Sequence, residues 1–349
     1  MIKKIKVLFL ITVRQVEVVY PLLRWKKQLL KSGIDVKVAN KWSWKNSSTF
    51  DLVILSNPYC GKRKSSNESL KERILREIKA SSKKRDRIAF FDTRDSCVTG
   101  YCDLLPNLDL LLKKQVYKDL NLYTGLNENF EHDSWLDSNN NYPKADPSDM
   151  GKITSAWNIA FNDYSVYRKP GKIFHWFGYF WPMDYTSVNN NRPYLSSFRG
   201  GLSGRKKTHR NKAISSLQSV KDKSIQLGPP ISKSKYLDEL RHSKTIVSPF
   251  GFGEICYRDM ETFIAGSILI KPIMNHLDTF PQLYNPWETY IPVKWDFSDL
   301  QDVLLNVERN YSKYLSVAEE GQRKYKESVE TPDLFIKQFK QLLSKAGIN

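Results

Sequence analysis

The stretch "SPFGFGEICYRDMETFIAGSILIKP", Ser248–Pro272, has the pattern of a strand end, a glycine turn, a helix and a second strand. The apolar runs "KTIVSPF" and "SILIKP" at its two ends have strand length. Gly251 and Gly253 form the turn, where the lack of a Cβ lets the backbone approach a ligand. The helix is expected to begin near Cys256 and to end at Gly266, a residue type that favours the position just past a helix. The stretch therefore predicts a strand–helix–strand unit.

Strands and helices alternate in the same way through both halves of the chain. The first half carries "IKVLFLIT", "IDVKVAN", "DLVILSN", "RIAFFDTRDS" and "LDLLLKKQ", and the second carries "YLSSFRGG", "SIQLGPP", "KTIVSPF", "SILIKP" and "ETYIPV". This order favours parallel sheets with right-handed crossovers, and 349 residues fit two domains. We expect an α/β domain over 1–170, a linker over 171–193, a second α/β domain over 194–330 and a terminal helix over 331–349. Ligands bind such folds at the carboxyl ends of the strands.

The composition predicts a basic protein of a reducing compartment. Lys and Arg number 55 against 37 Asp and Glu, and the net charge of +18 attracts anions. Four cysteines in so long a chain do not make a disulfide framework. The opening apolar run is broken by Arg14, and no run reaches the ~18 residues that span a bilayer. We therefore expect a cytoplasmic protein, with a basic surface able to rest on the inner face of an anionic membrane.

Charged residues follow the glycine turn at positions suited to a phosphorylated ligand. The first N–H groups of the predicted helix have no partner within the helix and can hold a phosphate. Arg258 and Glu261 are three residues apart, so they share one helix face. Arginine binds a diphosphate with a planar fork, and Glu261 can accept hydrogen bonds from a ribose diol. Glu254 precedes the helix, on the side where a transferred group would lie.

This stretch resembles the carboxyl-terminal half of GT-B glycosyltransferases, particularly the family-1-like and exostosin-like groups. The preceding "KYLDELRHSKTIVSPFG" and the following "HLDTFPQLYNPWETYIPVKWDFSDL" extend the resemblance over about residues 194–330. The first half shares only the α/β pattern. The resemblance implies two Rossmann-like domains facing a central cleft. It also implies that Glu261 binds the ribose and that Glu254 lies near the donor sugar. A glycine-rich donor loop matches "SFRGGLSGRKK", with donor-binding residues Arg199, Gly200, Gly201 and Arg205.

The activity that the resemblance implies is transfer of a sugar from a nucleotide-sugar donor, without a cofactor or a bound metal. No convincing Asp-x-Asp metal motif is seen, and Arg258 with a helix N-terminus can neutralise the leaving diphosphate. We expect hexosyl or pentosyl transfer to a glycan or lipid-linked saccharide in surface polysaccharide synthesis. Nucleic acid is not expected as a partner.

A catalytic base is expected from the first domain if the reaction inverts. Asp92 and Asp95 follow the strand "RIAFF", and Arg94 can orient one of them or bind an acidic acceptor. A local Asp cap with an Asp–Arg pair is the structural alternative. His175, in "FHWFGYFW", is a candidate for acceptor binding, and His276 for contact with the donor sugar; either can also serve as base. The sequence leaves open whether the reaction inverts or retains.

Other functions also fit the pattern. The charge of +18 suits a nucleic-acid-binding protein, although the basic residues are spread along the chain and no helix-turn-helix, RRM or zinc module is seen. A carbohydrate-binding protein without catalysis, an epimerase or a phosphorylase can share the GT-B-like fold.

Overall fold

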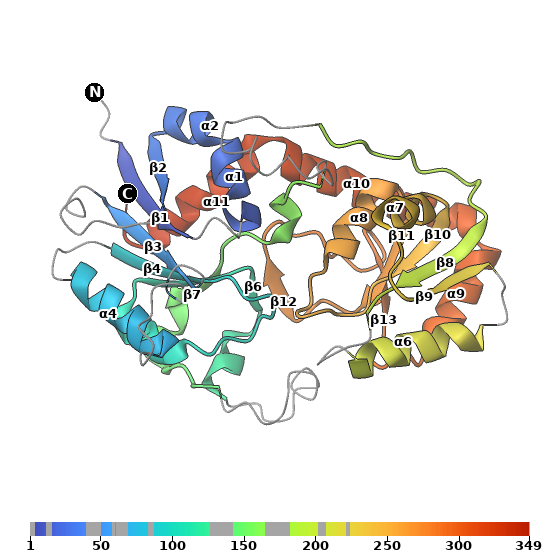
Figure 1. Cartoon of the computed structure of the whole chain (residues 1–349), viewed down its shortest axis with the longest axis horizontal. Coiled ribbons are helices and arrows are strands. Elements are labelled where there is room, and N and C mark those ends of the chain that lie inside the picture. The colour runs from blue at the N-terminus through green and yellow to red at the C-terminus, as the bar shows by residue number, and fades with distance from the viewer. Residues whose placement is uncertain are drawn as a thin grey trace.

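The computed structural model describes residues 4–11, 16–39, 50–57, 60, 69–82, 87–125, 142–164, 182–201, 207–220 and 224–348. The chain forms two parallel β-sheets with helices packed on them, which confirms the predicted α/β class (Figure 1). No helix in this described part is both long enough and apolar enough to cross a bilayer.

The first sheet has six parallel strands in the order β2-β1-β3-β4-β5-β7. Most of its strand residues are apolar and buried, as expected for strands covered on both faces. Its strands are β1 (Ile5–Leu10), β2 (Ile34–Ala39), β3 (Leu52–Ser56), β4 (Arg87–Asp92), β5 (Leu110–Lys113) and β7 (Ile153–Ser155). Among the described residues of this half, the helices with full bounds are α1 (Val16–Arg24), α2 (Lys26–Lys31) and α4 (Leu70–Ser82), with 3-10 segments η2 (Cys102–Asn107), η3 (Leu120–Thr124), η5 (Pro147–Lys152) and η6 (Ile159–Phe161).

The second sheet has five parallel strands in the order β13-β11-β10-β8-β9. The strands are β8 (Tyr194–Arg199), β9 (Ile225–Gly228), β10 (Ser243–Val247), β11 (Ile268–Pro272) and β13 (Ile291–Val293), and the helices between and after them are α6 (Lys207–Ser219), α7 (Lys233–Arg241), α8 (Tyr257–Ala265) and α9 (Leu300–Arg309). The strand order reverses between β8 and β10. In open α/β sheets this switch point leaves a crevice at the carboxyl ends, where ligands bind. The loops after β8 and β10 therefore flank the expected site.

The opening stretch folds as its pattern predicts. Helix α8 has Cys256 as its N-cap and ends at Gly266, which has a φ of 63°. This left-handed conformation suits glycine because it has no Cβ. The backbone N–H of Cys256 donates to the carboxylate of Asp259 at 3.0 Å, which satisfies one group at the helix start.

A small two-stranded sheet joins the two halves. The run "LDLLLKKQ", predicted as one strand, ends its first-sheet pairing at Lys113. The next residues form β6 (Gln115–Tyr117), which pairs antiparallel with β12 (Leu277–Thr279) from the second half. Three polar residues, Lys113, Lys114 and Gln115, lie at this point, but polar residues alone do not show that the chain changes sheet.

Three helices follow β13, and the last of them lies within the range 331–349 that the sequence predicts for a terminal helix. After α9 come α10 (Tyr311–Glu330) and α11 (Pro332–Lys345). Helix α10 packs against α8 and β11, whereas α11 packs on the first half beside α2 (Figure 1). Pro332 begins α11 because proline suits the first turn of a helix but interrupts a helix interior.

Candidate active site

A cavity of about 450 Å³ lies at the carboxyl ends of the strands, between the two halves. This volume is within the range of small-molecule sites. Asp95 and Ile159 line it from the first half, and the second half supplies the other walls. The predicted site residues that line it are Asp95, Arg199, Gly251, Gly253, Arg258 and Glu261.

Two arginines form the cationic end of this cavity. Arg258, in the first turn of α8, lies over the ring of Phe198 at 4.7 Å and donates to the backbone oxygen of Arg199. Arg210, from α6, donates from Nη1 to the backbone oxygen of Gly201 at 2.8 Å. Within the described residues neither guanidinium has a carboxylate partner, and both Nε atoms are buried without a hydrogen bond. Burial and the nearby Arg258 lower the pKa of Arg210.

Gly200 keeps space open between these arginines. A Cβ at this position would lie 3.5 Å from a guanidinium nitrogen of Arg210 and 3.5 Å from one of Arg258. The same Cβ would lie 3.0 Å from the ring of Phe198. The glycine after β8 therefore leaves a cradle bounded by two cations, which is suited to an anion.

Arg199 has a different environment from these two. Its guanidinium forms an ion pair with Glu239 of α7, with Nη2 and Oε2 2.9 Å apart, and donates to the backbone oxygen of Leu227 at 2.6 Å. Its charge is thus already compensated. Arg199 lines the cavity, but its guanidinium is less available to bind an anion than that of Arg210 or Arg258.

Glu261 lies on the α8 face that carries Arg258, as the three-residue spacing predicts. Its side chain is almost buried, and it accepts hydrogen bonds from Lys233 and, at 2.9 Å, from the hydroxyl of Tyr236. Burial raises the pKa of Tyr236. The charge of Arg258 opposes this rise in part, and the charge of Glu261 adds to it. The tyrosine therefore stays a neutral donor to Glu261.

A buried ion pair lies beside the glycine loop, Gly251–Cys256, and stabilises it. Asp259 and Lys271 are both fully buried, with Lys271 Nζ 3.1 Å from Asp259 Oδ2. Asp259 also accepts from the hydroxyls of Ser248 and Tyr284. One carboxylate thus ties together the end of β10, the start of α8 and β11, and fixes the shape of the loop that lines the cavity.

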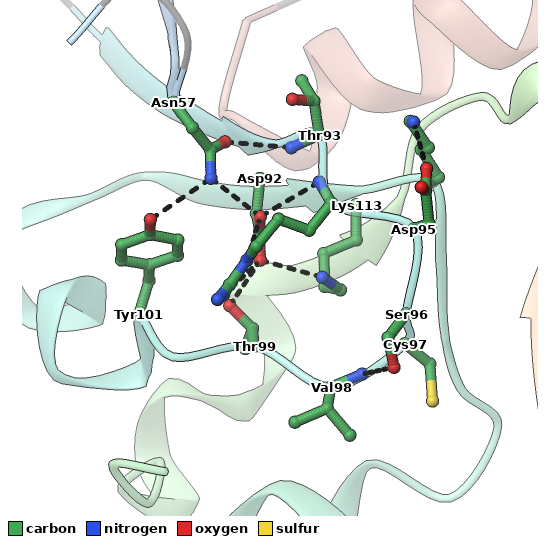
Figure 2. A network of polar contacts seen from close by, with 12 residues as sticks. Asn57, Asp92, Thr93, Asp95, Ser96, Cys97, Val98, Thr99, Tyr101 and Lys113 are labelled. Carbon is green, nitrogen blue, oxygen red and sulfur yellow. Dashed lines mark hydrogen bonds and ion pairs between the residues drawn. The ribbon is translucent and has the colours of Figure 1, made fainter. Parts of the chain in front are cut away.

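Asp92 is a structural anchor, which corrects its prediction as a base open to the cleft. Its side chain is 0% exposed and forms an ion pair with the equally buried Lys113 at 2.9 Å (Figure 2). It also accepts hydrogen bonds from Asn57, Arg94 and Thr99. Burial raises the pKa of Asp92, but Lys113 and Arg94 outweigh burial and hold the pKa below its usual range. A buried, saturated carboxylate cannot reach an acceptor hydroxyl.

Asp95 differs from Asp92 in being accessible. Its side chain is 44% exposed, lines the cavity and accepts from Lys114 Nζ at 2.8 Å. Arg94 donates to Asp92 from both Nε and Nη2 at 2.9 Å. Of its two predicted roles, this geometry fits the orientation of an aspartate, here Asp92. Of the two predicted carboxylates, only Asp95 faces the cavity.

Glu254 does not face the cavity, in contrast to its predicted place near the donor sugar. Its carboxylate is 2% exposed and points into the first half, where it accepts from the backbone N–H of Cys97 at 3.1 Å. His276, predicted to touch the donor sugar, does not line the cavity either; its ring packs against Trp295. Arg205 and His175 lie outside the described residues.

The cavity is also lined by Arg210, Lys233 and Tyr236, which are not among the residues predicted from the sequence. Arg210 lies on the helix after the glycine-rich loop, and helix α7 carries Lys233 and Tyr236 three residues apart. Helical spacing shows that these last two share a face. Their convergence on Glu261 follows from the packing of α7 against α8, for which the sequence has no local signal.

No protein-family model and no curated protein matches this sequence. Solved structures do match. One is an alpha-glucosyltransferase in complex with UDP and a 13-mer DNA containing an HMU base, with a TM-score of 0.51 and 10% identity over 97% of this chain and 99% of that one. Another is Anabaena Alr3699/HepE in complex with UDP, with a TM-score of 0.50 and 9% identity over 98% and 99% of the two chains.

These likenesses extend over nearly the whole chain and show its fold. The predicted GT-B architecture is confirmed, including the first half, for which the sequence had only the α/β pattern.

Proposed function

We propose that this chain is a glycosyltransferase that uses a nucleotide-sugar donor. The observation that carries the proposal is the pair of cations, Arg210 and Arg258, in a cavity between the two α/β halves. Neither has a carboxylate partner among the described residues, and both border the cradle at Gly200. A diphosphate supplies the missing negative charge. The fold shared with UDP-bound structures supports the same reading.

In this proposal each wall of the cavity has a separate task. Arg210, Arg258 and the N-terminus of α8 hold the diphosphate, and Glu261 accepts hydrogen bonds from the ribose hydroxyls. The acceptor oxygen forms a bond to the anomeric carbon, and the bond from that carbon to the diphosphate breaks. The nucleoside diphosphate leaves with the electron pair, which the two arginines stabilise. In an inverting reaction Asp95 takes the proton of the acceptor hydroxyl.

The finer features of the proposal rest on the family resemblance. We propose hexosyl or pentosyl transfer to a glycan or lipid-linked saccharide in surface polysaccharide synthesis. The reaction is proposed to need no metal, because two arginines and a helix N-terminus supply the positive charge that a metal would supply. The net charge of +18 supports association with an anionic membrane surface.

A second candidate acceptor is nucleic acid. The alpha-glucosyltransferase with this fold is bound to DNA, and a charge of +18 suits a polyanion. The DNA-bound structure is at odds with our expectation that nucleic acid is not a partner, and we withdraw that exclusion. Transfer of a labelled sugar to duplex DNA or to a saccharide distinguishes the two acceptors.

Calorimetric titration with UDP tests donor binding. The wild-type protein is expected to bind UDP, and Arg258→Ala is expected to weaken binding about 10- to 150-fold. This corresponds to about 1.5–3 kcal/mol for hydrogen bonds to a charged group. Arg241→Ala is the matched control, because it removes the same charge from an exposed residue of α7 outside the cavity.

The control is expected to bind UDP as the wild type does. If the wild type binds none of the UDP, GDP, CMP and dTDP nucleotides, the proposed function is wrong. Equal weakening by Arg241→Ala and Arg258→Ala would instead show a general charge effect and contradict the assigned site.

A further inference from the structure

Glu254 connects the glycine loop of the second half to a loop of the first half. Its Oε2 accepts from the backbone N–H of Cys97 at 3.1 Å, and its Oε1 accepts from the hydroxyl of Ser96 at 3.2 Å. These partners are more than 150 residues away in sequence. A carboxylate held by a backbone N–H and a hydroxyl in a buried setting is a strong, directional contact.

Gln115 joins the same contact from the first half. Its side-chain amide donates to Glu254 Oε2 at 2.9 Å and also to the backbone oxygen of Asp95. Gln115 is buried and is the first residue of β6, the strand that pairs with β12 of the second half. The amide thus bridges Asp95 and Glu254 at the point where the two halves are joined by backbone pairing.

Gly253 brings the two loops together at the level of the backbone. A Cβ at this position would overlap the carbonyl oxygen of Asp95. Any other residue would push the loops apart, so glycine is required by close approach here. The segment Gly251–Cys256 therefore lines the cavity on one side and touches Asp95–Cys97 on the other.

The first-half loop, residues 93–99, is fixed at both ends by Asp92. The backbone N–H of Arg94 donates to Asp92 Oδ1 at 3.2 Å, and the hydroxyl of Thr99 donates to Oδ2 at 2.9 Å (Figure 2). The middle of the loop, which carries Asp95, is not held by Asp92 itself. Glu254 contacts the two residues directly after Asp95 and so completes the support of this loop.

We propose that Glu254 is a positioning residue that couples nucleotide binding in the second half to the placement of Asp95 in the first. The inference rests on the proposed function, because it assumes a nucleotide at Arg258. Nucleotide binding orders the glycine loop. Because Glu254 belongs to this loop and accepts hydrogen bonds from Ser96 and Cys97, their loop becomes more ordered as well. A site linked in this way holds Asp95 more firmly when the donor is bound than when it is absent.

Amide hydrogen exchange of residues 93–99, with and without UDP, tests the coupling. In the wild-type protein, UDP is expected to slow exchange of this segment about tenfold, as a local opening is suppressed. In Glu254→Gln, exchange without ligand is expected to be faster and the response to UDP to fall below about twofold, because the charged acceptor is lost. The affinity for UDP, measured by calorimetry, should stay within about threefold of wild type.

Glu77→Gln is the matched control. Glu77 is also a buried carboxylate in an ion pair, with Arg73 of α4, but it does not line the cavity. This variant is expected to keep the UDP response of residues 93–99, so it separates coupling from a general loss of stability. Gln115→Met removes the bridge from the other side with little change in side-chain length, and is expected to lose the response as Glu254→Gln does.

The outcomes separate the two proposals. If UDP binds but leaves exchange of residues 93–99 unchanged in the wild type, the coupling is wrong and the proposed function stands. If UDP slows exchange of residues 93–99 in Glu254→Gln and in Gln115→Met as much as in wild type, the coupling is also wrong. If none of the nucleotides binds, the proposed function is wrong and the coupling with it.

Discussion

Single buried side chains decide how the loops around the cavity are held. Asp92 with Lys113 and Asp259 with Lys271 are two ion pairs at the carboxyl ends of the two sheets, with all four side chains fully buried. A buried charge is tolerated only when it is paired and hydrogen-bonded. Each aspartate also accepts hydrogen bonds from its neighbouring loop. The pairs therefore act as fixed points from which Asp95 and the glycine loop extend.

His209 makes the stability of the protein depend on pH. Burial, only partly opposed by the hydrogen bond to the backbone oxygen of Trp295, lowers the pKa of His209 to about 2. As pH falls below the usual histidine pKa of about 6.5, the unfolded chain binds a proton that the folded protein does not. Unfolding is therefore favoured by acid. From pH 7.5 to pH 5 we expect this group to remove about 2 kcal/mol of stability.

Denaturant titrations at the two pH values measure this effect. His209→Phe fills the space beside Phe250 and Phe297 without a titrating group, so it should lose about 2 kcal/mol less stability between pH 7.5 and pH 5 than wild type. The same acid-induced loss in His209→Phe and wild type would contradict the assignment.

At the scale of elements, the last helix belongs by packing to the first half of the molecule. Phe335 of α11 is fully buried against the rings of Trp25, Trp157 and Phe161, at centroid distances of 5.2–5.4 Å. These aromatic residues surround the first sheet, not the second. Helix α11 therefore contributes to the hydrophobic core of the first half.

Phe335→Ala is expected to destabilise the protein by about 3–5 kcal/mol, because it leaves a cavity among aromatic rings. Chemical denaturation measures the loss. Leu334→Ala changes the neighbouring residue of the same helix, which is 38% exposed, and should cost less than about 1 kcal/mol. A similar cost for both changes would show that α11 does not complete the first core.

For the whole molecule, our proposal that binding needs no metal depends on the positive charge in the cavity. Arg210 and Arg258 come from two helices that meet only through the fold of the second half. Their guanidinium groups border the cradle at Gly200. This positive charge is part of the protein itself, so nucleotide binding should not depend on divalent ions.

UDP affinity is therefore expected to be the same, within about threefold, in EDTA and in millimolar Mg²⁺ or Mn²⁺. Calorimetry in the two buffers gives the comparison. If binding disappears in EDTA and returns when the ion is added back, a metal ion is needed to bind the diphosphate. The test concerns binding alone, so it does not require the acceptor to be known.

The sequence by itself determined the local elements and the order in which they alternate. The apolar runs of β1, β3, β8, β10 and β11 lie close to their predicted bounds, and α8 begins and ends at the predicted residues. Hydrophobic spacing, glycine and capping residues act over a few neighbours, so these features can be read from the chain. The same spacing correctly put Arg258 and Glu261 on one face of α8.

Only the tertiary structure decided which polar groups meet. The change of sheet at Lys113, the three-residue strands β6, β7 and β12, and the docking of α11 on the first half depend on contacts between distant segments. The same holds for Arg210 beside Arg258, for the burial of Asp92 and for Glu254, whose partner Cys97 is 157 residues away. Whether a carboxylate faces ligand or neighbour depends on the packing around it, because burial and partners set its charge and access. Asp92 and Asp95 are alike in sequence context, yet only the folded structure buries one and leaves the other at the cavity.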